Sequence, residues 1–294
     1  MKTYLNNIFK EFNIENSQLN VIAVKALIAA MISKNICFQE KQKLSFDEQI
    51  FNECWKVYSN CLYYFDPNYN RKTDFSLFFR YIIDSQMLNK KINFHALFCP
   101  GYTKNGYKSH LGKTTLWKLK ELYRISNMLQ DSNIELSITS YYSDVFLENC
   151  NSELEPKWKE QLDYNRKLFH LEGNKYFNSE YIKNASDISV FASEKDSAGY
   201  VDNTIISNIS KSTYDAFTKS NKKFYTSMGF NEEQMKYRND RLITMYRIFS
   251  DYLNSQENSV FLPMENMYER ENIFSENGTC TMYLKLKKWG EINE

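Results

Sequence analysis

The sequence predicts an α/β fold: a Rossmann-like, mostly parallel sheet flanked by helices, preceded by a helical N-terminal segment. Residues 92–98 and 134–138 are short apolar runs, which are typical of buried strands. Between them, residues 114–130 carry Leu, Ile and Met side chains at helical spacing. A strand, a helix and a second strand in this order form a βαβ unit, which implies parallel strands and a right-handed crossover.

The first ninety residues show helical patterns without strand signals. Ser45 and Glu48 form a capping box that opens one helix, and Thr73 or Asp74 caps another that ends near Leu88. We therefore predict two parts: residues 1–90 as a helical segment packed on the core, and residues 91–294 as the Rossmann-like domain.

The later part of the chain continues the alternation of helices and strands. A helix is expected from Pro156, a third strand at residues 188–191, and helices at residues 203–219 and 232–253. Residues 259–263 and 281–286 are expected to be closing strands.

The charges balance, which excludes a surface that is basic throughout. The chain has 37 Lys and Arg against 36 Asp and Glu, for a formal charge of +1. Basic residues nevertheless recur in three helical segments, at residues 157–167, 219–223 and 236–247. These segments could bind the phosphate backbone of an RNA such as tRNA, or they could be ordinary solvated helix faces.

Several classes of protein are disfavoured by what the sequence lacks. No apolar run reaches the roughly 20 residues of a membrane-spanning helix, and the N-terminus does not resemble a signal peptide. The six Cys form no CxxC pair and the three His form no HExxH motif, so we expect no metal site. There is no GxGxxG, and Gly112-Lys-Thr lacks the upstream Gly of a P-loop, so no cofactor is expected. These features predict a cytoplasmic protein.

Ligands of open α/β sheets bind beyond the carboxyl ends of the strands, which directs attention to two loops. Cys99 follows the first strand and is either a nucleophile, activated by nearby Lys104 and Lys108, or a small buried thiol. Tyr102, Lys104 and Lys108 are candidate substrate ligands in the same loop. Asp144 follows the second strand and could bind a substrate amine or hydroxyl, or cap a helix.

A third group of polar residues follows the strand expected at 259–263. Glu265, Tyr268 and Arg270 could together bind an amino-acid-like substrate, or they could form a surface ion-pair network. His95 alternates with its neighbours along its strand and is interpreted as a packed or edge histidine and not as a ligand. Five tyrosines are predicted at the rim of the crevice: Tyr102, Tyr107, Tyr141, Tyr142 and Tyr268.

In its order of parts, the chain resembles the tRNA-dependent cyclodipeptide synthases, which are similar to the catalytic core of class I aminoacyl-tRNA synthetases. The segments that carry this resemblance are residues 94–99, 134–138, 157–167, 245–247 and 260–268. The resemblance implies an aminoacyl transferase. Cys99 would stand at the position of the family's nucleophilic serine, Tyr246 and Tyr268 would orient the amine, and Glu265 would act as a base or amine anchor.

The chain also resembles the isocyanide synthases of the pyoverdine/dityrosine type. Cys99-Pro100, Lys104-Asn105, Lys108, Gly112 and the segment 143–146 (Ser-Asp-Val-Phe) are similar to elements of that family. This resemblance implies an enzyme of secondary metabolism in which Lys104 or Lys108 binds a sugar phosphate. A non-enzymatic interaction protein is a third alternative, and among the three we expect a transferase.

Overall fold

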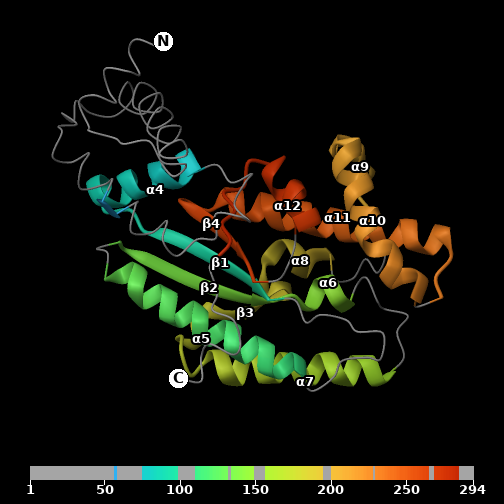
Figure 1. The fold of residues 1–294 in the computed structure, drawn as a ribbon, viewed down its shortest axis with the longest axis horizontal. Helices are drawn as coiled ribbons and strands as arrows, with labels where there is room; N and C mark the ends of the chain where they lie inside the picture. The colour runs from blue at the N-terminus through green and yellow to red at the C-terminus, as the bar shows by residue number, and fades with distance from the viewer. Residues whose placement is uncertain are drawn as a thin grey trace, which may run out of the picture.

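The computed structural model describes residues 56–57, 75–98, 110–131, 134–148, 156–194, 200–227, 229–264 and 268–284. The described strands form one four-stranded sheet in the order β3-β2-β1-β4, and every pairing in it is parallel (Figure 1). The strands are β1 (Ile92–Phe98), β2 (Leu136–Tyr142), β3 (Ile182–Asn184) and β4 (Ser259–Pro263). The predicted Rossmann-like α/β fold is confirmed.

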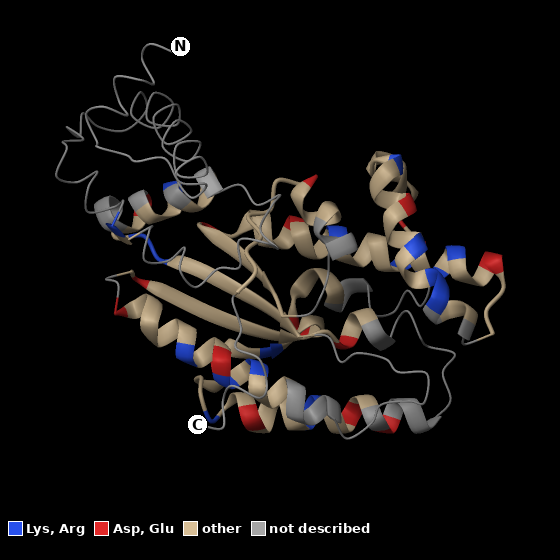
Figure 2. Cartoon of the chain, viewed as in Figure 1, with Lys and Arg blue, Asp and Glu red and all other residues tan. Residues whose placement is uncertain are grey.

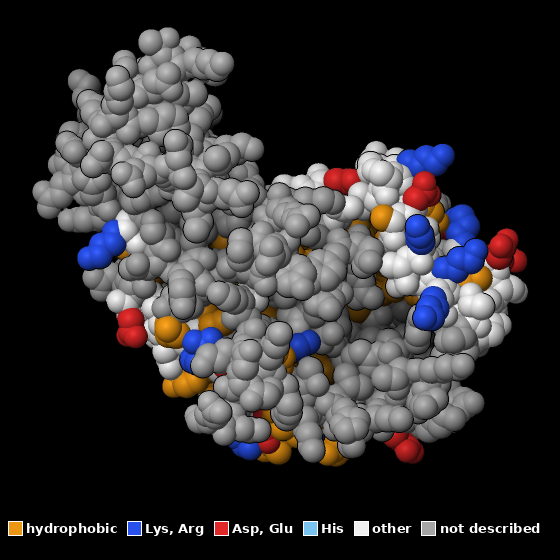
Figure 3. Space-filling view, viewed as in Figure 1, with side chains coloured by type: hydrophobic (Ala, Val, Ile, Leu, Met, Phe, Trp, Pro, Cys, Tyr) orange, Lys and Arg blue, Asp and Glu red, His pale blue; other side chains and the backbone are white. Residues whose placement is uncertain are grey.

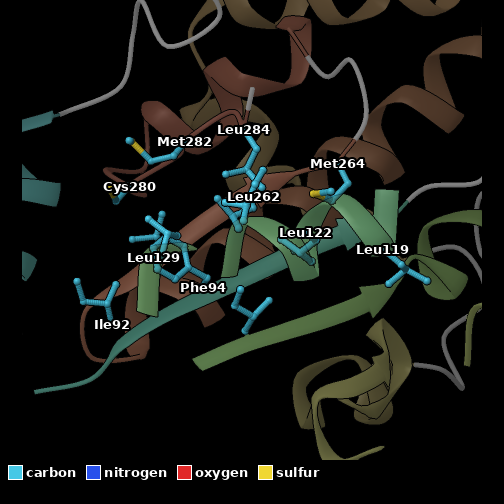
Figure 4. Close-up of a cluster of buried hydrophobic side chains, with 14 of the residues drawn as sticks. Ile92, Phe94, Leu119, Leu122, Leu129, Leu262, Met264, Cys280, Met282 and Leu284 are labelled. Carbon is cyan, nitrogen blue, oxygen red and sulfur yellow. The ribbon is translucent and has the colours of Figure 1, made fainter. Parts of the chain in front are cut away.

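One face of the sheet is covered by α4 (Phe75–Leu88), α5 (His110–Gln130) and α7 (Pro156–Gly173). Alternate residues of β1 point to this face, because successive side chains of a strand point in opposite directions. They pack with α5 in what we call the first core (Figure 4), which includes Ile92, Phe94, Ala96, Phe98, Leu119, Leu122, Leu129, Leu262 and Met264.

The other face is covered by α10 (Lys211–Ser227), α11 (Glu232–Ser255) and α12 (Tyr268–Ser275). Leu97 of β1, Tyr141 of β2 and Phe261 of β4 reach this side and join the second core. Shorter elements complete the described chain: α6 (Asp144–Glu148), η1 (Ser179–Tyr181), η2 (Ala185–Asp187), α8 (Ser189–Glu194) and α9 (Asn203–Asn208).

The path of the chain creates a switch point between β1 and β4. The helix α5 lies between β1 and β2 in the chain, and α7 lies between β2 and β3. Both helices contribute to the first core. The helix that precedes β4, α11, packs in the second core on the opposite face. The strand order therefore proceeds from β1 to β3 in one direction and returns to β4 on the other side of β1. Such a reversal is where open α/β sheets bind their ligands.

Phe249 of α11 is the centre of the second core. Its ring centroid lies 5.7 to 6.5 Å from those of six other aromatic residues, in stacked and edge-on arrangements. These partners come from the strands β2 and β4, from α11 itself and from three other helices: Tyr141, Phe146, Phe191, Tyr252, Phe261 and Phe274. The residue is fully buried, so it holds α11 against the sheet through contacts with several elements at once.

The third strand was predicted in the wrong place. Residues 189–194 form the helix α8, and the strand is three residues long at Ile182–Asn184. A four-residue apolar run cannot distinguish a strand from a buried turn of helix by its period. Here Ile188 and Phe191, three positions apart, are both buried in the second core. The second strand also lies later than predicted, at Leu136–Tyr142.

The helix expected at residues 203–219 is two helices, α9 and α10. The break occurs at Ser210, whose hydroxyl accepts a hydrogen bond from the Thr213 backbone and so caps α10. Glu276, which follows α12, accepts hydrogen bonds from the Ser210 amide and hydroxyl. A contact distant in the sequence therefore fixes the break.

The last predicted strand is present as one parallel bridge between Phe261 and Thr281. The amide of Met282 donates to the Phe261 carbonyl at 2.9 Å, which adds this segment beside β4. Residues 285–286 of that prediction lie outside the described residues.

Of the predicted N-terminal segment, the structure describes α4 and residues 56–57. Phe78 of α4 packs edge-on against Phe94 of β1, with ring centroids 6.3 Å apart, so α4 belongs to the first core. The division at residue 90 stays a prediction. No helix in the described ranges combines the length and apolarity that crossing a membrane requires.

We predict that Phe249→Ala lowers the free energy of unfolding by about 3–5 kcal/mol, because it removes a fully buried ring and leaves a cavity among six aromatic partners. Urea denaturation followed by circular dichroism measures this loss. Tyr164→Ala on α7 is the matched control, since its ring is 59% exposed and its loss should cost about 0.5 kcal/mol or less. Equal losses for both variants would contradict the role of Phe249.

Candidate functional site

The carboxyl ends of β1, β2 and β4 lie level with one another. Leu97 pairs with Pro263 and Phe98 pairs with Tyr142 in the sheet register. Beyond the strands, the Met264 amide donates to the Leu97 carbonyl at 3.2 Å. The Ser143 amide donates to the Phe98 carbonyl at 3.0 Å. We call the place where these three strands end the switch-point edge, and it is the candidate site.

Most of the predicted site residues follow the strands that end at this edge. Five of them lie outside the described residues: Cys99, Tyr102, Lys104, Lys108 and Glu265. In the sequence Cys99 comes directly after Phe98, and Glu265 comes directly after Met264. Phe98 is the last residue of β1, and Met264 directly follows the last residue of the neighbouring strand β4. The helix α12 begins at Tyr268 and includes Arg270, and their side chains are outside the described set.

Asp144 is buried and fully engaged within the protein. Its carboxylate accepts hydrogen bonds from the Ser186 hydroxyl at 2.6 Å, from the Ser186 amide at 3.0 Å and from the Val145 amide at 2.9 Å. Ser186 belongs to η2, which follows β3, so Asp144 ties the ends of β2 and β3 together. This position at the start of α6 agrees with the helix-capping alternative, and binding of a substrate by Asp144 stays a prediction.

Three of the tyrosines named from the sequence are core residues. Tyr246 is 1% exposed and stacks on Phe146, with ring centroids 4.8 Å apart. Tyr141 packs in the second core and Tyr142 in the first, so placing these two at the rim was wrong. Adjacent strand residues point to opposite faces, and here both faces are covered by helices.

Ser143 contributes a polar side chain at the switch-point edge. It follows β2 directly and is 0% exposed. Its hydroxyl forms no hydrogen bond in the described structure. Buried hydroxyls normally have a partner, so an unsatisfied one beside a switch point is a candidate ligand contact.

Arg238 and Arg241 of α11 are functional candidates that the sequence reasoning missed. They belong to the basic segment at residues 236–247, yet they are 4% and 5% exposed. They are therefore neither part of a solvated face nor available to an RNA backbone at the surface. The guanidinium carbon of Arg238 lies 4.0 Å from the ring centroid of Phe230, and that of Arg241 lies 5.5 Å from the ring centroid of Tyr237.

A helical wheel could have revealed these arginines. Arg238 lies eleven residues before Phe249, and Arg241 lies eleven residues before Tyr252. Eleven residues are about three helical turns, so the two members of each pair lie on nearly the same side of the helix. The apolar face of α11 therefore continues through the two arginines.

His95 is a packed histidine, as its position in β1 predicted. It is 5% exposed, and its ring stacks against that of Tyr141 with centroids 6.0 Å apart. The Nδ1 atom of His95 lies 3.4 Å from the hydroxyl oxygen of Tyr141. This oxygen in turn lies 3.3 Å from the hydroxyl oxygen of Tyr252. Burial, with a smaller effect from the charge of Lys183, lowers the pKa of His95 to about 4.

No group of three or more metal-ligating side chains is found among the described residues. The chemistry that this part of the site offers is hydrogen bonding and positive charge.

Comparisons with known proteins give little beyond the fold. No family model and no curated protein matches this chain. Among solved structures, the PvcA protein from Pseudomonas aeruginosa is similar, with 11% identity and a TM-score of 0.49 over 80% of this chain and 83% of that chain.

We predict that His95 makes the protein less stable as the pH falls from 6.5 to 4. Over this range the unfolded chain protonates His95 while the folded chain keeps it neutral, so the free energy of unfolding falls with pH, by on the order of 3 kcal/mol. Above pH 6.5 both states are neutral and this contribution is fully present.

The measurement is urea denaturation at a series of pH values. His95→Gln should reduce the slope over this window. The same slope in wild type and His95→Gln would contradict the assignment.

Proposed function

We propose that this chain is a biosynthetic enzyme that modifies a small, amino-acid-derived molecule at the switch-point edge. The observation that carries this proposal is the common level of the carboxyl ends of β1, β2 and β4, with the strand order reversing at β1. Loops that leave such an edge form the ligand crevice in open α/β sheets.

Within this class, the isocyanide-synthase resemblance agrees best with the strand arrangement. Two of the segments that carry it, Cys99-Pro100 and residues 143–146, directly follow β1 and β2. These strands are neighbours and their last residues, Phe98 and Tyr142, are paired. The resemblance thus concentrates at one edge of the sheet, which supports an activity on an amino acid together with a sugar phosphate.

We predict that Ser143→Ala lowers turnover at least tenfold and leaves stability within about 0.5 kcal/mol, since the hydroxyl forms no hydrogen bond in the described structure. The assay incubates the purified protein with each amino acid and a pentose phosphate, and mass spectrometry detects a new product. Urea denaturation of the same samples measures stability.

Ser140→Ala is the matched control. Ser140 is also 0% exposed with an unpaired hydroxyl, but it lies three residues earlier in β2 beside Ala96, away from the switch-point edge. Its loss should change neither turnover nor stability. The proposal is wrong if no amino acid is consumed with or without a sugar phosphate, or if both variants retain full turnover.

Aminoacyl transfer from tRNA, as in the cyclodipeptide synthases, is a second candidate. The lysines of α10 favour it, because Lys219, Lys222 and Lys223 are exposed on one helix. Figure 2 shows Lys and Arg along α10 and the start of α11, and Figure 3 shows blue side chains gathered on that end of the molecule.

We predict for this candidate that replacing Lys219, Lys222 and Lys223 by Gln weakens tRNA binding at low salt and reduces the salt dependence of that binding. Each contact to a phosphate releases counterions from the RNA, so the loss of a contact makes binding less sensitive to salt. Filter binding at several salt concentrations measures both quantities. Lys120→Gln on α5 is the single-site control, because Lys120 is also exposed but lies outside the three basic segments. If wild type binds no aminoacyl-tRNA at low salt, this second candidate is excluded.

A further inference from the structure

We propose that Arg241 binds the carboxylate or phosphate of an anionic substrate at the switch-point edge, an inference that rests on the function proposed above.

The direction of α11 places Arg241 beyond the carboxyl ends of the strands. Tyr252, near the end of the helix, lies against β1 and β2 through His95 and Tyr141. Tyr246, nearer its start, stacks on Phe146, which follows the end of β2. Arg241 lies five residues before Tyr246, about 7.5 Å further along the helix axis and away from the strands. Figure 1 shows the start of α11 on the side to which the strand arrowheads point.

The same helix geometry turns Arg241 toward the central strands. Arg241 precedes Tyr252 by eleven residues, which rotates it by only about 20° from the direction of Tyr252. Tyr252 faces the neighbouring strands β1 and β2, so Arg241 faces the region beyond their ends. That region is where the Phe98 carbonyl and Ser143 lie.

The guanidinium of Arg241 is buried without an anion to balance it among the described residues. Three acidic residues of the described ranges are buried, and each has other partners. Glu121 pairs with Arg124, Asp144 binds Ser186, and Asp240 accepts from Tyr214 and Lys236. The contact seen for Arg241 is the Tyr237 ring.

A buried charge without a counter-charge is unfavourable, and proteins keep such groups where a ligand completes them. A guanidinium presents a planar fork of N–H donors that matches two oxygens of a carboxylate or phosphate. The ligand chemistry is therefore a small oxyanion group, as amino acids and sugar phosphates carry.

The test measures anion binding rather than turnover. Wild type, Arg241→Gln, Arg241→Lys and Arg247→Gln are titrated with inorganic phosphate, and separately with acetate, at constant ionic strength, and thermal denaturation reports binding. We expect one of these anions to raise the Tm of the wild type in a saturable manner. The anion that does so shows whether the site binds a phosphate or a carboxylate group. Arg241→Gln should weaken it at least tenfold and Arg241→Lys less, since the lysine keeps the charge but not the fork.

Arg247→Gln is the matched control, because Arg247 lies on the same helix, is more exposed and pairs with Asp251. It should change the affinity less than twofold. Without added anion, Arg241→Gln should have an unchanged or higher Tm, because it removes an uncompensated buried charge. If Arg241→Gln does not fold, Arg241→Lys alone must weaken binding more than Arg247→Gln does.

The inference is overturned if neither anion stabilises wild type, or if binding is equal in the Arg241 and Arg247 variants. It is also overturned if Arg241→Gln lowers Tm by several degrees with unchanged anion affinity, which would identify an internal ion pair. These results differ from a failure of the proposed function, which is the absence of product from a protein that still binds the anion through Arg241.

Discussion

The packing of α11 across the sheet is the constraint on which the rest of the structure depends. Phe249 joins this helix to the strands and to the helices around it, through rings that belong to elements far apart in the sequence. Because the ring is buried on all sides, the helix cannot slide or rotate without breaking several contacts together. The position of every other side chain on α11 follows from this anchor.

The anchor divides α11 into two functional halves. The half near Tyr252 lies against the strands, where Tyr252 meets Tyr141 and His95 in a buried polar chain. The earlier half continues beyond the strand ends and carries Arg238 and Arg241 at buried positions. A single helix thereby connects the packing of the second core with the proposed site at the switch-point edge.

Hydrogen-bonded carboxylates hold the elements around the sheet together. Asp144 links the ends of β2 and β3 through Ser186, and Asp240 holds α10 through Tyr214. Glu276 joins the end of α12 to the start of α10. Burial opposes its ionisation, but hydrogen bonds from Ser210 and Thr213 outweigh this effect and lower its pKa. Each carboxylate accepts hydrogen bonds from a residue of another element, which keeps these elements together.

The sequence by itself determined the βαβ unit, the parallel sheet and the positions of β1 and β4, because apolar period and turn residues are local properties of the chain. It also identified the strand ends as the place for a site. Only the tertiary structure decided that residues 189–191 are helical, that Tyr246 and Asp144 are held inside the protein, and that Arg241 is buried. The physical reason is that burial and charge pairing depend on contacts between distant segments: the same arginine on α11 would be a solvated surface charge if the helix did not pack across the sheet.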